Sequence, residues 1–171
     1  FACDAITTMR VASSPAPARS IRARSSGLRD CSSPARASML KLSTELVDQE
    51  TVELGCVITS DQKFLVPYRS GAIATYRLFR HLDRLLVSDP VGRGRLATTK
   101  ARYQEWKRLA TEPEIAAARG PNPNLARAII AGGGGRARFA QLRSASGSLT
   151  AYADSRVTDP HRPLARAQDL P

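Results

Sequence analysis

The stretch SGAIATYRLFRHLDRLL, residues 70–86, decides how the fold is read. Its apolar residues recur every three or four positions, which is the spacing of one buried helix face. These residues are Ala72, Ile73, Tyr76, Phe79, Leu82, Leu85 and Leu86. Arg77, Arg80 and Arg84 lie beside that face at the same intervals, so they share a neighbouring face. We therefore expect an amphipathic helix with a basic surface, capped by Ser70.

A second helix is predicted over residues 95–110, because its apolar residues follow the same spacing. They are Leu96, Thr99, Tyr103, Trp106, Leu109 and Ala110. Thr111-Glu112-Pro113-Glu114 then has the pattern of a capping box with proline in the first turn, which predicts a helix start. That short helix is expected to end at Gly120, and the pattern restarts after residues 121–123.

Upstream of residue 70 the pattern favours strands. Two β-rich runs, residues 52–59 and 63–66, flank a turn-like segment at 60–62 and predict a β-hairpin, with Cys56 in a strand. Pro67 would close the second strand. Residues 40–47 read equally well as a short helix or as an extended lead-in.

The two ends of the chain have the composition of tails. Residues 1–38 are rich in Ala, Ser, Arg and Pro, which is typical of an organelle transit peptide or of a disordered basic tail. Met9 and Met39 are both candidate start residues. The four glycines at 132–135 predict a flexible break, followed by a helical segment over 136–145 and an extended or disordered tail over 146–171.

The expected fold is therefore mainly α. It is a small three- to four-helix bundle over residues 70–145, preceded by a lead-in and short β-hairpin at 39–69, with extended N- and C-terminal tails. No apolar run approaches the roughly 18–20 residues that span a bilayer, so we expect a soluble or peripheral chain.

Residue types that carry catalysis or bind metals occur here without the patterns that such chemistry needs. Cys3, Cys31 and Cys56 form no CxxC pair, and His81 and His161 have no partner at ligand spacing. The glycine run lacks the phosphate-loop pattern, and no serine lies in a GxSxG elbow. We therefore expect no enzyme, no catalytic residue, and no metal or cofactor of the chain's own.

Charge points instead to an acidic partner. The chain has a formal net charge of +11, and residues 67–119 concentrate eleven Lys and Arg against five Asp and Glu. Such a surplus favours nucleic acid, an anionic membrane or an acidic protein. The basic residues predicted to contact the partner are Arg77, Arg80, Arg84, Arg102, Lys107 and Arg108. Tyr103 and Trp106 could stack on bases, although their place on the apolar face favours core packing.

The two helices also resemble the LYR-motif family of small mitochondrial helical proteins. Residues 75–77 (Thr-Tyr-Arg) occupy the place of the Leu-Tyr-Arg motif, followed by Phe79 and Arg80. On the second helix, Trp106-Lys107 takes the place of the family's aromatic–base pair. Residues 111–114 take the place of the next helix start. Threonine at position 75 and the glycine run depart from the family pattern.

The resemblance implies a non-enzymatic accessory or assembly subunit of a large mitochondrial complex, on the matrix side, such as a respiratory-chain complex. The partner would be an acyl carrier protein, whose 4'-phosphopantetheine acyl chain would enter between the helices. The residues implied to line that channel are Tyr76, Phe79, Tyr103 and Trp106. Association with a membrane would then be peripheral, through the complex. The alternative function is an organellar ribosomal or other RNA-associated protein, whose arginines would neutralise phosphates.

Overall fold

The computed structural model describes residues 29–158, and almost all of them are helical. The long helices are α1 (Arg29–Thr59), α2 (Leu65–Leu85), α3 (Pro90–Trp106) and α6 (Gly134–Thr158). The short elements are the 3-10 turn η1 (Gln62–Phe64), the π-helix η2 (Lys107–Thr111), α4 (Glu112–Ala118) and α5 (Pro123–Ala131). The predicted mainly α bundle is confirmed.

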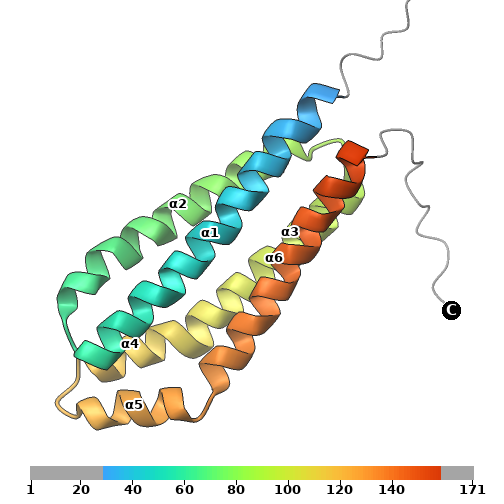
Figure 1. Ribbon diagram of the computed structural model, residues 1–171. Coiled ribbons are helices and arrows are strands. Elements are labelled where there is room, and N and C mark those ends of the chain that lie inside the picture. Colours follow the sequence, from blue (N-terminus) through green and yellow to red (C-terminus); the bar gives the residue numbers. More distant parts are fainter. Residues whose placement is uncertain (1–28, 159–171) are drawn as a thin grey trace, which may run out of the picture.

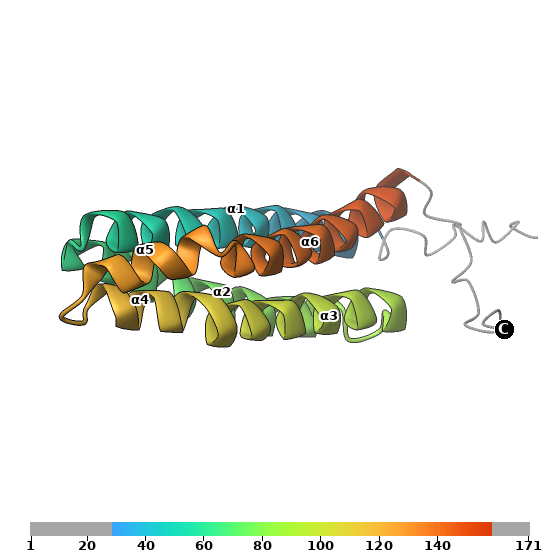
Figure 2. The ribbon, with the colours of Figure 1, turned by 90° about the horizontal axis from the view of Figure 1, so that it is seen from below.

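Helices α1, α2 and α6 and the continuous run of α3, η2 and α4 are the rods of a bundle that has two layers (Figures 1 and 2). One layer holds α1 and α6, and the other holds α2 and the continuous run of α3, η2 and α4. Helix α1 packs against both α2 and α6, and α3 packs against α6. The start of α1 and the end of α6 lie at the same end of the bundle, here called the terminal end. The opposite, far end carries α4, α5 and the connection from α1 to α2.

One apolar core fills the bundle from the terminal end to its middle. Its fully buried leucines recur at helical spacing on each rod, which explains why these segments fold as helices around a common centre. They include Leu42, Leu46, Leu82, Leu96, Leu142 and Leu149. A second cluster at the far end contains only Val57, Ala118 and Ala126, with Ala117 and Ile130 beside it.

Polar side-chain caps and two residues with left-handed backbone conformation explain where helices begin and where the chain turns between them. The Asp89 side chain accepts from the Gly92 N–H at 2.9 Å and starts α3, while Asn122 caps α5. Ser60 has a φ of 57° after α1, and Gly133 has a φ of 74° between α5 and α6. The break between α5 and α6 is confined to Gly132 and Gly133, because Gly134 and Gly135 already belong to α6, and the flexibility predicted for residues 132–135 stays a prediction. Gly133 provides the conformation that other residues rarely adopt.

The predicted β-hairpin is wrong. Residues 52–59 are the last turns of α1, Cys56 is buried in that helix, and residues 65–68 begin α2. The helical spacing was hidden because polar Gln49 and Glu53 occupy core positions between the apolar ones. Pro67 lies in the first turn of α2, where its missing N–H breaks no helical hydrogen bond.

The expected tails are shorter than predicted, because residues 29–38 belong to α1 and residues 146–158 to α6. The buried face of α6 continues from Leu142 through Ser146 and Leu149 to Ala153. The last turns of α6 are therefore packed against the bundle. The transit-peptide or tail expectation for residues 1–28, and the tail expectation for 159–171, lie outside the described residues.

The predicted capping box at residues 111–114 is also absent. Thr111 makes no side-chain cap, and its hydroxyl donates to the Lys107 carbonyl at 3.2 Å. The rod runs from α3 into α4 through the π-helix without a break. Within residues 29–158, none of the helices has the length and apolarity needed to cross a membrane.

Candidate functional site

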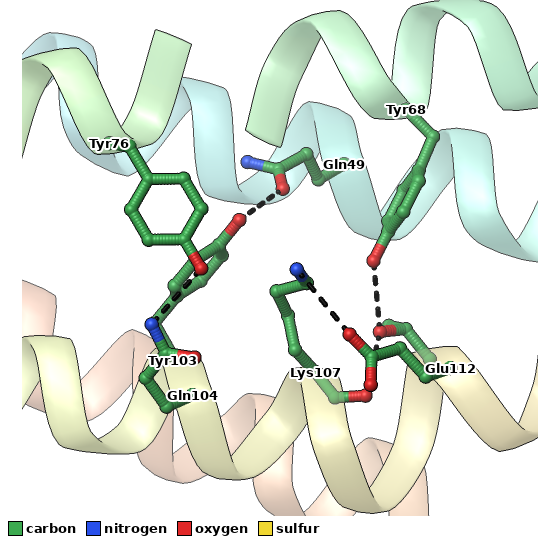
Figure 3. A network of polar contacts seen from close by, with 8 residues as sticks. Gln49, Tyr68, Tyr76, Tyr103, Gln104, Lys107 and Glu112 are labelled. Carbon is green, nitrogen blue, oxygen red and sulfur yellow. Dashed lines mark hydrogen bonds and ion pairs between the residues drawn. The ribbon is translucent and has the colours of Figure 1, made fainter. Parts of the chain in front are cut away.

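A buried polar layer crosses the middle of the bundle (Figure 3). The Gln49 amide on α1 donates to Thr75 Oγ1 on α2 at 2.7 Å, and the Tyr103 hydroxyl on α3 donates to Gln49 Oε1 at 2.8 Å. Gln49, Thr75 and Tyr103 are at most 1% exposed. Because a buried polar group left unpaired is costly, this set of bonds fixes how three helices align.

A second buried bond ties α2 to the π-helix. The hydroxyls of Tyr68 and Thr111 lie 3.1 Å apart, and both side chains are buried. Burial raises the pKa of the Tyr68 hydroxyl, and it also raises the pKa of Tyr103. Both phenols therefore stay neutral near pH 7, which keeps a proton available for these bonds.

Two carboxyl groups meet in the core toward the far end. Glu53 on α1 is 2% exposed and Glu114 on α4 is 3% exposed. Burial, a hydrogen bond to Glu114 and the charges of Glu114 and Glu50 raise the pKa of Glu53 well above its ordinary range. Glu53 therefore retains a proton at neutral pH, while its Oε1 has no hydrogen-bond partner. We call Glu53 and Glu114 the carboxyl pair.

The surroundings of the carboxyl pair make room for it. Glu114 is the third residue of α4, which follows the π-helix directly, and Gly135 at the start of α6 faces it. A β-carbon at position 135 would lie 2.5 Å from Glu114 Oε1, so the glycine is needed for the close approach. Within residues 29–158, no cluster of three or more His, Cys, Asp or Glu side chains could bind a metal ion.

The residues predicted to line an acyl channel form a packed aromatic cluster. Phe79, Tyr103 and Trp106 are at most 4% exposed, whereas Tyr76 is 38% exposed. Ring centroids of Phe79 and Tyr103 are 5.6 Å apart, and those of Tyr103 and Trp106 are 6.1 Å apart. These are the separations of ordinary aromatic packing. A channel role stays a prediction, and it depended on the LYR resemblance.

The predicted basic residues differ in their contacts. Arg77, Arg80, Arg84 and Arg108 are exposed and form no ion pair within residues 29–158. Arg102 pairs with Glu105 on its own helix at 2.8 Å. The Lys107 ammonium nitrogen lies 3.5 Å from Glu112 Oε1 and 5.8 Å from the centre of the Tyr76 ring (Figure 3). A role in partner binding stays a prediction for all six.

Sequence reasoning missed the polar layer and the carboxyl pair. Glu114 was assigned to the predicted capping box, whereas its side chain is buried in the core. The available signal was the spacing of Gln49 and Glu53 with Leu42 and Leu46. It could have placed both polar residues on the buried face.

Comparison with protein-family models identifies a family that this chain matches. The family model described as the CHASE3 domain matches residues 28–160, which is most of the chain. No curated protein and no solved structure gave a significant match.

This match overturns the LYR resemblance and what depended on it. CHASE3 domains are sensory domains, typically extracellular or periplasmic, so the expectation of a mitochondrial matrix subunit of a respiratory complex is wrong. An acyl carrier protein partner is not supported, and the alternative of a ribosomal or RNA-associated protein is no better supported. The cofactor expectation, a carrier-borne acyl chain, loses its basis with the resemblance.

Proposed function

The chain belongs to the CHASE3 domain family, and on that premise we propose that it is an extracytoplasmic sensory domain. In this proposal a stimulus shifts α1 relative to α6, and the shift is passed on at the terminal end. The domain acts by binding and movement and performs no chemistry of its own.

The observation that carries the proposal is the arrangement of the chain ends. Helices α1 and α6 pack side by side, and the start of α1 lies at the same end of the bundle as the end of α6 (Figure 1). Any rearrangement inside the bundle that moves one of them against the other changes their spacing where the chain continues. Shifts of packed helices by about 1–2 Å are a common form of such signals.

The interior supports the proposal because its polar contacts allow a limited number of helix alignments. The bonds of Gln49 to Thr75 and Tyr103 hold only in one register of α1, α2 and α3. A shift of α1 must break both bonds, because Gln49 takes part in each of them. Such discrete alternatives suit a two-state element better than a uniform apolar core does.

The test measures the spacing of α1 and α6 directly. Spin labels are placed at Ala37 and Ser155, which are exposed on these helices, after Cys3, Cys31 and Cys56 are replaced by alanine. Dipolar broadening is recorded with a panel of amino acids, sugars, dicarboxylates and aliphatic carboxylates. We expect at least one compound to change the label separation by about 1–2 Å.

A label pair at Lys41 and Asp48, both exposed on α1, is the matched control, because a single rigid helix keeps their separation. A separation between Ala37 and Ser155 that stays constant across the whole panel would contradict the proposal. Equal changes in both label pairs would also contradict it, since they would report local effects on α1.

A further inference from the structure

A cavity of about 410 Å³ opens at the terminal end of the bundle. Its apolar walls come from the start of α1, from the end of α2 with the residues that follow it, and from the last turns of α6. They are Ala35, Met39, Leu85, Leu86, Val87 and Ala153. The volume falls within the range of about 300–1,000 Å³ for small-molecule sites. Met39 offers a flexible floor that adapts to an occupant.

The one carboxylate in the wall is engaged by the protein itself. Asp89 accepts from the Gly92 N–H, and each of its oxygens lies 2.8 Å from the Tyr152 hydroxyl, which donates to it. Burial and the neighbouring Asp89 raise the pKa of Tyr152 to about 12, so the phenol keeps its proton. The Arg95 guanidinium lies 5.4 Å from the centre of the Tyr152 ring. Asp89 is therefore unsuited to bind an added cation.

The positive charge at the cavity is available to an anion. Arg84 lines the cavity, is exposed, and forms no ion pair within residues 29–158. Arg156 also lines this wall, but its side chain already has a partner in the protein, so the proposal depends on Arg84 alone. The site thus combines apolar walls with a cationic rim, which is complementary to a molecule with an apolar body and one negative end.

We propose that this cavity binds a small amphipathic carboxylate, with its chain between α1 and α6 and its carboxylate at Arg84. The inference rests on the proposed sensory function, because it names the class of stimulus and the place where it acts. An occupant would touch α1, the α2–α3 connection and α6 at once. It would therefore alter the spacing of α1 and α6 at the point where the signal leaves the bundle.

The probe is octanoate, and binding is measured by isothermal titration calorimetry on the full chain. We expect octanoate to bind more tightly than 1-octanol or octylammonium, which share its chain and lack its charge. Arg84→Gln should weaken octanoate about two- to fivefold, as expected for an exposed ion pair, and should leave 1-octanol unchanged. Arg80→Gln is the matched control, since Arg80 is exposed on the same helix and lies outside the cavity wall.

A second variant tests the cavity independently of charge. Val87 is 65% exposed and lines the cavity, so Val87→Trp can fill it with little effect on the core. We expect this variant to lose both octanoate and 1-octanol. The proposal is overturned if octanoate binds no better than 1-octanol, if Arg84→Gln and Arg80→Gln behave alike, or if Val87→Trp binds octanoate as the parent does.

The spin-label pair separates this inference from the proposed function. Octanoate that binds as expected without changing the separation of Ala37 and Ser155 would leave the site standing and contradict the sensory proposal for this ligand class. Another compound of the panel that changes the separation, combined with no octanoate binding, would overturn the site and support the sensory function.

Discussion

The buried cores at the two ends of the bundle differ in composition. From the terminal end to the middle, leucines such as Leu82 and Leu149 pack in one continuous apolar core. At the far end the apolar cluster shrinks to Val57 and two alanines, and the buried carboxyl pair and the π-helix lie close to it. The difference teaches that stability and adjustability are separated along the rods. Large apolar side chains hold one half together, while the other half depends on polar contacts that can change.

The largest effect that would test this contrast is the loss of a core leucine. We expect Leu82→Ala to lower the free energy of unfolding by about 2–5 kcal/mol, because Leu82 is fully buried in the large core. Val57→Ala removes less apolar surface from a smaller cluster and should cost about half as much. Urea denaturation followed by circular dichroism measures both. Equal losses would contradict the division between the two halves.

The carboxyl pair predicts how stability depends on pH. The folded state raises the pKa of Glu53 above its ordinary value of 4.5, so the folded chain binds more protons than the unfolded chain. Stability from this group is complete below that value and is lost as the pH rises from about 4.5 toward the raised folded pKa. The free energy of unfolding therefore falls by at most about 1.4 kcal/mol per pH unit because of this group.

Glu53→Gln should flatten this dependence, because the amide does not titrate, and urea midpoints from pH 4 to 9 report the slope. Val57→Ala is the matched control, since it also weakens the far end but leaves the carboxyl pair in place. A parent chain whose stability does not fall over this range would contradict the raised pKa of Glu53.

Adding one methyl group at each of two glycines of α6 compares a crowded position at the far end with an open position in the other half. Gly135→Ala would push a β-carbon to 2.5 Å from Glu114 Oε1, so we expect it to cost about 1–3 kcal/mol. Gly147→Ala meets nothing within 4 Å and should stabilise the helix by about 0.5–1 kcal/mol. Thermal melting of both variants gives the sign, and a Gly135→Ala variant that is stabilised, as is expected for Gly147→Ala, would show that Gly135 is not crowded.

The smallest expected effect concerns the polar layer that lies between the two halves. Tyr103→Phe leaves Gln49 Oε1 without its buried donor, and should cost about 1–2 kcal/mol. Tyr76→Phe removes only an exposed bond from Gln104 at 3.0 Å and should cost less than about 0.5 kcal/mol. Urea denaturation compares them. A Tyr103→Phe chain as stable as Tyr76→Phe would mean that the layer does not fix the helices.

The same division explains what the sequence could predict. Apolar spacing predicted the helices around residues 70–86 and 95–110, and the Pro-Asn-Pro segment at 121–123 predicted the start of α5. The predicted caps at Ser70 and at residues 111–114 are wrong, because α2 begins at Leu65 and Thr111 makes no side-chain cap. Residues 51–59 were misread because β-branched and polar residues there mask a buried helix face, and propensity yields to packing. The candidate site was missed for a related reason. A glutamate at position 53 or 114 reads as surface until both partners are seen to meet in space.

The π-helix at Lys107–Thr111 has a consequence for the rod that contains it. A π-turn takes in one more residue than an α-turn, so it changes the rotational phase of everything downstream. Deleting one residue from this segment would restore a regular α-helix with α4 in the same phase, whereas winding all five residues as a regular α-helix would turn α4 by about 100° relative to α3. Glu114 would then leave the interior while Trp106 stayed in place. The π-turn therefore sets which side chains of α4 face the interior, although it contributes few core side chains of its own.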